Sequence, residues 1–259
     1  GIIVNRSDTT AGEITVQDWV ESYLVIPNSF RDLKRKSEEM LKQVQHDNYQ
    51  EQAKLDFVHR AGIVHRIDKE TSGILLVANN PPAFVNLQNQ FKERIVKKTY
   101  IALVHGKVAP AEGDIKVPVG RLPWNRTKFG VVVGGRESVT RYRVLSILRY
   151  KRHSGKPKAH PESDSGQARM TGTDEPLTLL ELYPETGRTH QIRVHLKYFN
   201  HPIFADFLYA GRKTSRNDRE LLPRVFLHAG KISFNHPRTG ESVSFESPLP
   251  KELADFIHN

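Results

Sequence analysis

The sequence predicts an α+β fold, because strand and helix patterns follow one another irregularly along its 259 residues. Aliphatic runs typical of strands cover residues 74–78, 99–104, 139–148 and 177–182. Apolar residues at helical spacing recur in residues 14–26, 81–91 and 189–199. No repeat period is visible, and the length suits one domain with a well-buried core, with two small domains as the alternative.

Capping and turn residues support these elements. Asn80 can cap a helix whose first turn contains Pro81, and the apolar face of that helix consists of Phe84, Leu87 and Phe91. Thr15 and Thr189 are expected to cap the helices that follow them. Residues 226–234 and 242–245 predict a closing hairpin, with a turn at residues 237–240 between its strands.

Two segments interrupt this pattern. Residues 30–55 are dense in Lys, Glu and Gln, which indicates a solvated helix or a disordered insertion. Residues 150–175 have no periodicity and are rich in Ser, Gly, Pro and His, so we expect a surface loop that a short turn could replace. The chain opens on Gly1 without an initiator Met, and we expect the natural start to lie upstream.

Composition narrows the function classes. The net charge of +10 and the pI of about 9.7 favour a polyanionic partner, and nucleic acid is the commonest one. The absence of cysteine rules out disulfides and thiolate metal sites, and it fits a reducing cytoplasmic location. No apolar run is long enough to cross a bilayer, so we expect no membrane association.

The first segment with chemical potential runs from His65 to Gly73 and reads His-Arg-Ile-Asp-Lys-Glu-Thr-Ser-Gly. Asp68 stands between the cations Arg66 and Lys69, on a loop that feeds the strand pattern at 74–78. A carboxylate in such a place can be held ionised and aimed. An ordinary surface loop of Asp and Lys would have the same composition.

Two further segments carry candidates. Arg188 stands at the predicted start of a helix, where an anion such as phosphate or carboxylate could bind; a helix with a cationic solvent face is the alternative. His190 and Arg193 fall on faces of that helix away from Ile192. Tyr100 follows two lysines inside a strand, where it could stack on a base or handle a proton; a core aromatic is the alternative.

Together these segments resemble the RluA family of RNA pseudouridine synthases. The resemblance rests on residues 65–78, residues 98–102 and residues 187–193, in the family's order. It implies a mixed, mostly antiparallel sheet with flanking helices and a central cleft. It also implies that residues 1–259 form a single catalytic domain that flips a uridine out of RNA and rearranges its glycosidic bond.

The resemblance also implies roles for individual residues. Asp68 would attack the sugar or the base, or abstract a proton; these three options stay open. Tyr100 would stack on the flipped base or take its proton, and Arg188 would pair with Asp68, with Arg193 as the next candidate if Arg188 does not reach it. Arg66 would face the RNA and Ile192 the uracil. The remaining substrate-binding positions are His65, Thr71 and Arg193.

Other expectations follow from the same resemblance. No metal and no cofactor is expected, since no His-Glu-x-x-His pattern is present. The expected partner is large-subunit ribosomal RNA, with transfer RNA as the alternative, and the chain is expected to be a monomer. A non-catalytic RNA-binding protein and a metal-dependent hydrolase are the competing classes. Asn200 and Ala205 replace glycines of the family, and Ala205 would be strained at a positive φ.

Overall fold

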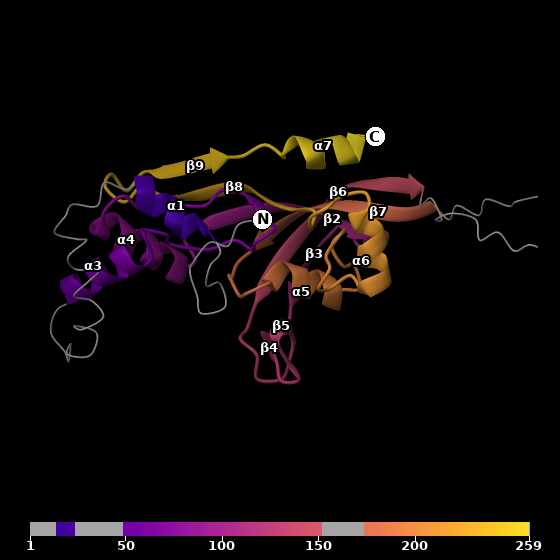
Figure 1. Ribbon diagram of the computed structural model, residues 1–259, viewed down its shortest axis with the longest axis horizontal. Helices are drawn as coiled ribbons and strands as arrows, with labels where there is room; N and C mark the ends of the chain where they lie inside the picture. The colour runs from indigo at the N-terminus through magenta and orange to yellow at the C-terminus, as the bar shows by residue number, and fades with distance from the viewer. Residues whose placement is uncertain (1–13, 24–48, 152–173, 259) are drawn as a thin grey trace, which may run out of the picture.

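The main sheet of the computed structural model has seven strands, and residues 14–23, 49–151 and 174–258 of the chain are described (Figure 1). Six strands lie in the order β1-β8-β2-β7-β6-β3, and β9 pairs with β8. β1 and β8 are parallel, whereas the other pairs are antiparallel. The strands of this sheet are β1 Ser72–Gly73, β2 Lys97–His105, β3 Glu112–Lys116, β6 Val139–Lys151, β7 Asp174–Pro184, β8 Leu227–Asn235 and β9 Ser242–Glu246.

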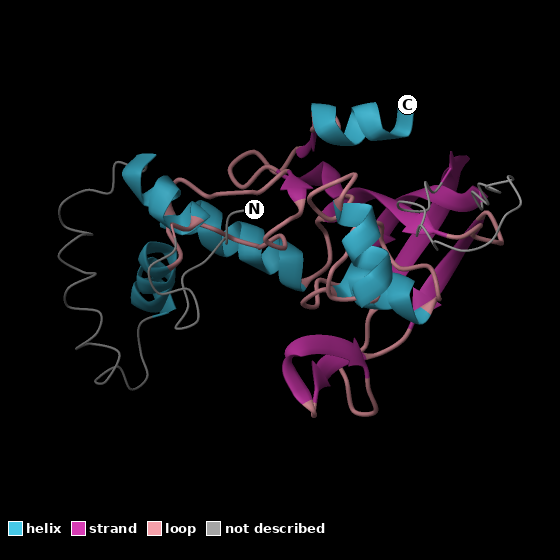
Figure 2. Cartoon of the chain, turned by 45° about the vertical axis from the view of Figure 1, so that its right-hand side comes forward, coloured by secondary structure: helices cyan, strands magenta, loops and turns pink. Residues whose placement is uncertain are grey.

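A second sheet contains two strands, β4 Val119–Leu122 and β5 Asn125–Val131. Figure 2 shows it set apart from the main sheet. The described helices are α1 Val16–Tyr23, α3 Tyr49–His59, α4 Pro81–Lys92, α5 Gln191–Tyr198, α6 Arg212–Arg219 and α7 Lys251–His258. The α+β class is confirmed, but α6 and α7 were not predicted from the sequence.

Two apolar clusters hold these elements together. The larger joins β2 and β7 to α5 and α7, and it includes the fully buried Phe226. The smaller packs α3 and α4 against β8, with the rings of Phe57 and Phe84 edge to face at 5.9 Å. Each fully buried Leu or Phe side chain contributes about 1.5–3 kcal/mol of transfer free energy. A cleft lies between the two clusters, and residues of both line it.

Several local predictions are confirmed. Asn80 caps α4, its side chain accepting a hydrogen bond from the Ala83 N–H at 2.9 Å. The Thr15 hydroxyl accepts from the Asp18 N–H at 3.2 Å at the start of α1. β8 and β9 form the predicted closing hairpin. Each of these features depends on neighbouring residues, which is why local sequence was sufficient.

The strand predicted at residues 74–78 is wrong. Pairing with β8 ends at Gly73, with one more bond from the Ile74 N–H to the Ala229 carbonyl at 3.0 Å, and Val77 forms only an isolated antiparallel bridge with Ile63. Beyond it, the Leu76 N–H donates to His65 Nε2 and the Ala78 N–H to the Gly62 carbonyl, both at 2.8 Å. The His65 ring and the Gly62 carbonyl therefore accept the hydrogen bonds that a neighbouring strand would accept in a sheet.

The start of α5 also differs from prediction. Thr189 is not the N-cap; that position belongs to His190, which adopts the left-handed conformation with φ 56°. Asn200 and Ala205 have φ of 63° and 60°, as their replacement of glycine suggested. The Ala205 N–H donates to Asp218, and its carbonyl accepts from Arg219 Nε at 3.0 Å. These bonds offset the strain that Ala205 incurs.

The two predicted insertions fall largely outside the described residues, at 24–48 and 152–173, as does the start of the chain. The end of the first forms part of α3. β6 and β7 are paired up to Lys151 and from Asp174. Within the described ranges, no helix has both the length and the apolar character required to cross a bilayer.

Candidate active site

A cleft of about 480 Å³ opens where the two apolar clusters meet. Val64 and Phe91 from the smaller cluster face Tyr100, Ile192 and Leu227 from the larger one. The other predicted site residues in its lining are His65, Arg66, Asp68, Thr71 and Arg188. Segments separated by about half the chain therefore meet in one cavity, while Arg193 lies behind Asp68.

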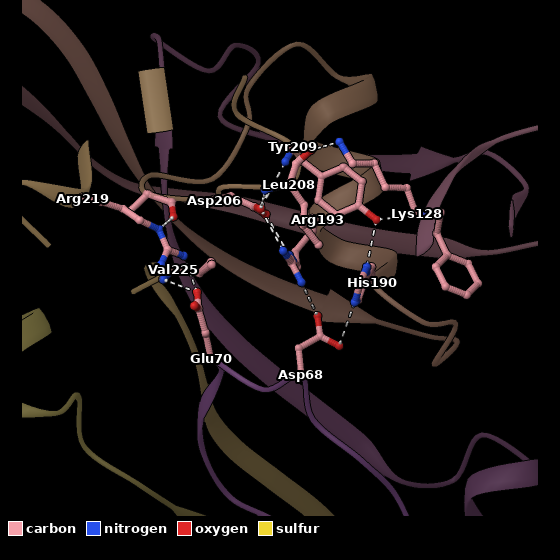
Figure 3. A network of polar contacts seen from close by, with 12 residues as sticks. Asp68, Glu70, Lys128, His190, Arg193, Asp206, Leu208, Tyr209, Arg219 and Val225 are labelled. Atoms are coloured by element: carbon pink, nitrogen blue, oxygen red, sulfur yellow. Dashed lines mark hydrogen bonds and ion pairs between the residues drawn. The ribbon is translucent and has the colours of Figure 1, made fainter. Parts of the chain in front are cut away.

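Hydrogen bonds and an ion pair hold the loop that carries Asp68. The Thr71 N–H donates to the Asp68 carbonyl at 2.9 Å and closes a tight turn. Glu70 pairs with Arg219 and accepts from the Val225 N–H at 3.3 Å (Figure 3). Arg224 donates to the Glu70 carbonyl at 2.7 Å. These bonds fix the loop, so the Asp68 carboxylate is presented from a rigid base.

Arg193 is the direct partner of Asp68. Its Nη1 lies 3.3 Å from Asp68 Oδ2, while Nε and Nη2 bind both oxygens of Asp206 at 2.8 Å (Figure 3). Burial acts to lower the pKa of Arg193, but its hydrogen bonds with Asp206 and the charges of Asp206 and Asp68 outweigh burial and raise it. The guanidinium also lies over the Tyr209 ring, 5.1 Å from its centre. Arg193 is therefore a fixed, buried cation that orients Asp68.

The predicted pairing of Arg188 with Asp68 is wrong. The Arg188 N–H donates to Gln191 Oε1 at 3.0 Å and Arg188 Nε donates to the Glu137 carbonyl at 3.4 Å. No ion pair joins Arg188 to Asp68 in the described part of the chain. The reason is that α5 begins only at Gln191, so Arg188 belongs to the preceding turn. The alternative of a helix with a cationic solvent face does not hold for Arg193, because its side chain is buried.

Three residues that the sequence analysis did not assign to the site complete it. His190 Nε2 lies 4.0 Å from Asp68 Oδ1, and His190 Nδ1 lies 2.9 Å from the Tyr209 hydroxyl. Asp206 is fully buried beneath Arg193 and also accepts from the Leu208 and Tyr209 N–H groups. The available signal was the carboxylate of Asp206 and the phenol of Tyr209, in a segment that follows residues 187–193 closely in the sequence.

Tyr100 is held at a bulge in β2 between Thr99 and Tyr100. Burial raises the pKa of the Tyr100 phenol, and the negative charge of Asp68 raises it further. At neutral pH the phenol therefore keeps its proton. This favours stacking or hydrogen-bond donation by Tyr100 over removal of a proton.

His65 supports the wall of the cleft. Its Nε2 accepts from the Leu76 N–H, and its ring stacks on Phe91 with centres 4.8 Å apart. Burial lowers the pKa of His65 to about 3, with a contribution from the charge of Lys98. Burial and Lys97 in turn lower the pKa of Lys98 to about 8. His65 is thus neutral, and its Nε2 lone pair is engaged inside the protein.

The lining of the cleft is strongly cationic. Arg66 is exposed, whereas Thr71 and Ile192 are buried in the walls. The basic side chains of the lining are Arg60, Arg66, Lys92, Arg94, Lys98 and Arg188, and its carboxylates are Asp68 and Glu185. One carboxylate on the loop floor thus faces a cavity whose surroundings suit a polyanion.

Comparison with known proteins agrees with this geometry. Residues 16–198 match the family model described as RNA pseudouridylate synthase. The chain is 41% identical over 202 residues to the uncharacterized RNA pseudouridine synthase YlyB of Bacillus subtilis (strain 168), covering 78% of this chain and 56% of that protein. It is 41% identical over 206 residues to ribosomal large subunit pseudouridine synthase D of Neisseria meningitidis serogroup B (strain MC58), covering 77% and 48%.

Solved structures show the same fold. The human RNA pseudouridylate synthase domain containing 1 superposes with a TM-score of 0.56 at 28% identity, covering 76% of this chain and 73% of that one. The chain spans about half the length of the curated relatives that it matches. The match covers the loop of Asp68, the strand of Tyr100 and the helix of Arg193. The chain therefore belongs to the RNA pseudouridylate synthase family.

Proposed function

We propose that this chain isomerises specific uridines in structured RNA to pseudouridine, with Asp68 at the reacting centre. The observation that carries the proposal is the position of the Asp68 carboxylate. Its side chain is 20% exposed, at the floor of the cleft, and it is held by Arg193, whose side chain is only 7% exposed. A carboxylate that is oriented from behind and open in front is suited to act on a bound group.

The shape and charge of the cleft support an RNA substrate. Its volume of about 480 Å³ lies within the range of roughly 300–1,000 Å³ that is typical of small-ligand sites. A nucleotide in a helix cannot reach Asp68 unless it leaves the stack, so the substrate uridine would be flipped into the cleft. The basic lining and the net charge of +10 would hold the flanking phosphates.

The isomerisation is balanced without any co-reactant. The bond from C1′ of the ribose to N1 of uracil breaks, and a bond from C1′ to C5 forms. N1 gains a proton and C5 loses one. Asp68 would act on the sugar, on the base or as proton acceptor, as carboxylates do at electron-poor sugar carbons. Tyr100 would stack on the base, Ile192 would pack against it, and Arg66 would contact the RNA at the entrance.

Large-subunit ribosomal RNA is the substrate that we propose. The relative from Neisseria meningitidis is named for the ribosomal large subunit, and it shares 41% of aligned residues with this chain. Transfer RNA is the alternative. Transcripts of each kind, labelled with tritium on C5 of uridine, would separate them, because only an accepted substrate releases tritium to water.

The central test compares Asp68→Asn with Asp114→Asn. Both changes are isosteric, but Asp114 lies on β3 at the surface, where it pairs with Lys116 and Arg141. We expect Asp68→Asn to bind RNA normally and to release no tritium, while Asp114→Asn remains active. If Asp68→Asn keeps its rate within about tenfold of wild type, a barrier change under ~1.4 kcal/mol, the role of Asp68 is wrong. Binding without turnover by the wild type would favour a non-catalytic RNA-binding protein.

A further inference from the structure

Among the described residues, the side chains of Arg193 and His190 lie against the Asp68 carboxylate, and the arginine pair does not explain the place of His190. Arg193 Nη1 faces Oδ2 at 3.3 Å, whereas His190 Nε2 faces Oδ1 at 4.0 Å (Figure 3). The His190 ring is wedged between the rings of Phe129 and Tyr209, at centre distances of 5.6 and 5.7 Å. Its position is thus fixed by packing, and the remaining question is which ring nitrogen carries hydrogen.

The hydrogen bonds of the Tyr209 hydroxyl indicate which nitrogen of His190 carries the hydrogen. Its oxygen accepts a hydrogen bond from the Phe129 N–H at 3.2 Å. Its single hydrogen then needs an acceptor, and His190 Nδ1, at 2.9 Å, is the one that the described residues provide. If Nδ1 carried the hydrogen instead, the Tyr209 O–H would have no acceptor within the part of the chain that the structure describes. The Nε2 lone pair would also face the Asp68 carboxylate, which is unfavourable.

The charge state of His190 agrees with this tautomer. Burial lowers the pKa of His190, and the positive charges of Arg193 and Arg66 act in the same direction. The negative charges of Asp68 and Asp206 oppose them without reversing the shift. The imidazole is therefore neutral at neutral pH and has one N–H to place.

The backbone of His190 supports a functional demand at this position. His190 is the N-cap of α5 and lies in the left-handed region, with φ 56° and ψ 18°. Its side chain makes no capping hydrogen bond. Asn would suit this conformation at least as well, so helix capping does not explain the imidazole. Strain retained where a ring faces a reactive carboxylate is typical of functional sites.

We propose that Tyr209 locks His190 in the tautomer with hydrogen on Nε2, so that the His190 N–H points at Asp68 Oδ1 from 4.0 Å and positions Asp68 electrostatically, at a distance beyond a direct hydrogen bond. The proposal deepens the proposed function, since it assumes that Asp68 is the reacting group. Arg193 would hold one carboxylate oxygen, and the His190 N–H would orient and polarise the other. His190 and Tyr209 are positioning residues, because they act through Asp68.

The donor chain also reaches the small β4–β5 sheet. It consists of hydrogen bonds from the Phe129 N–H on β5 to the Tyr209 hydroxyl and from that hydroxyl to His190, whose Nε2 lies 4.0 Å from Asp68. Lys128, beside Phe129, donates to the Leu208 carbonyl at 3.3 Å and fastens the same strand to the Tyr209 segment (Figure 3). β5 therefore supplies the donor that occupies the Tyr209 oxygen, while the Tyr209 hydroxyl lies against His190 Nδ1.

The direct test is nitrogen-15 NMR spectroscopy of the histidine rings. The chain has 12 histidines, and His190 is assigned by the signals that disappear in His190→Asn. We expect the wild-type ring to be neutral and protonated on Nε2 at neutral pH. Tyr209→Phe removes only the hydroxyl, so we expect it to give a mixture of the two tautomers. A ring protonated on Nδ1 or on both nitrogens in the wild type overturns the proposal.

Kinetics test the consequence for Asp68. Tyr209→Phe should lower kcat roughly tenfold and leave KM for RNA unchanged, because the His190 N–H is then no longer held toward the Asp68 carboxylate. Tyr142→Phe, a buried phenol on β6, is the matched control and should keep wild-type kcat. His190→Asn keeps the backbone conformation but is too short to reach Asp68, whereas His190→Gln can reach it. We therefore expect Gln to recover part of the activity that Asn loses.

The outcomes are separable. Wild-type kcat in Tyr209→Phe or His190→Asn, or a change confined to KM, overturns the positioning role. Equal loss in His190→Gln and His190→Asn, with unchanged melting temperatures, does the same. If wild-type chain releases no tritium from any RNA, the proposed function fails, while the NMR experiment still decides the tautomer.

Discussion

Replacing Arg193 by Lys tests which cation holds Asp68. The guanidinium of Arg193 makes three contacts at once, two with Asp206 at 2.8 Å and one with Asp68 at 3.3 Å. The single nitrogen of lysine cannot reproduce this fork, although it retains the positive charge. We expect lysine to stay with the fully buried Asp206, since an unpaired buried carboxylate is the costlier outcome. Asp68 then loses its partner.

The size of the effect follows from that contact. A hydrogen bond between charged groups contributes about 1.5–3 kcal/mol, which corresponds to a rate loss of about 10- to 150-fold if the contact is fully expressed in the transition state. RNA affinity should change little, because Arg193 is buried behind Asp68 and does not line the cleft. The loss should therefore fall on kcat.

Arg188→Lys is the matched control. Arg188 donates through Nε to the Glu137 carbonyl at 3.4 Å and makes no ion pair with Asp68 among the described residues. Tritium release under saturating RNA gives kcat for both variants, and thermal melting reports whether Arg193→Lys is still folded. Wild-type kcat in Arg193→Lys, together with a tenfold or larger loss (~1.4 kcal/mol) in Arg188→Lys, would refute the assignment made from the structure.

Three further predictions concern pH and packing. The pKa of His65 is lowered to about 3 in the folded chain. Below pH 6.5 the unfolded chain therefore binds a proton at this histidine that the folded chain does not bind. The free energy of unfolding should fall by ~1.4 kcal/mol per pH unit as the pH is lowered toward 4. In urea denaturation, His65→Gln should reduce the pH dependence of the unfolding free energy by the uptake of one proton. An unchanged pH dependence would contradict the prediction. The pKa of Lys98 is lowered to about 8, so RNA affinity should decline as pH rises through 8, and Lys98→Arg should remove the decline. Phe84→Ala in the smaller cluster should cost about 3–5 kcal/mol in chemical denaturation, and a loss below 1 kcal/mol would contradict the packing described.

The sequence by itself determined the features that depend on neighbouring residues. Asn80 and Pro81 start α4 because the cap acts over three residues. The closing hairpin follows from two alternating runs and a turn. The three motifs identified the family, and they selected Asp68 and Tyr100, which lie in one cleft. Such signals are local, or they are long strings whose joint match is specific.

The tertiary structure alone decided which side chains meet. The family resemblance placed Arg188 against Asp68, with Arg193 as the next candidate, but a left-handed residue at His190 starts the helix at Gln191 and Arg193 makes the contact. Asp206 lies 13 residues beyond Arg193, and Asp68 lies 125 residues before it, yet both bind it. Residues 74–78 failed as a strand because their donors found acceptors at His65 and Gly62. Periodicity reports which residues are apolar, but the partner of each buried polar group is set by chain segments that only folding brings together.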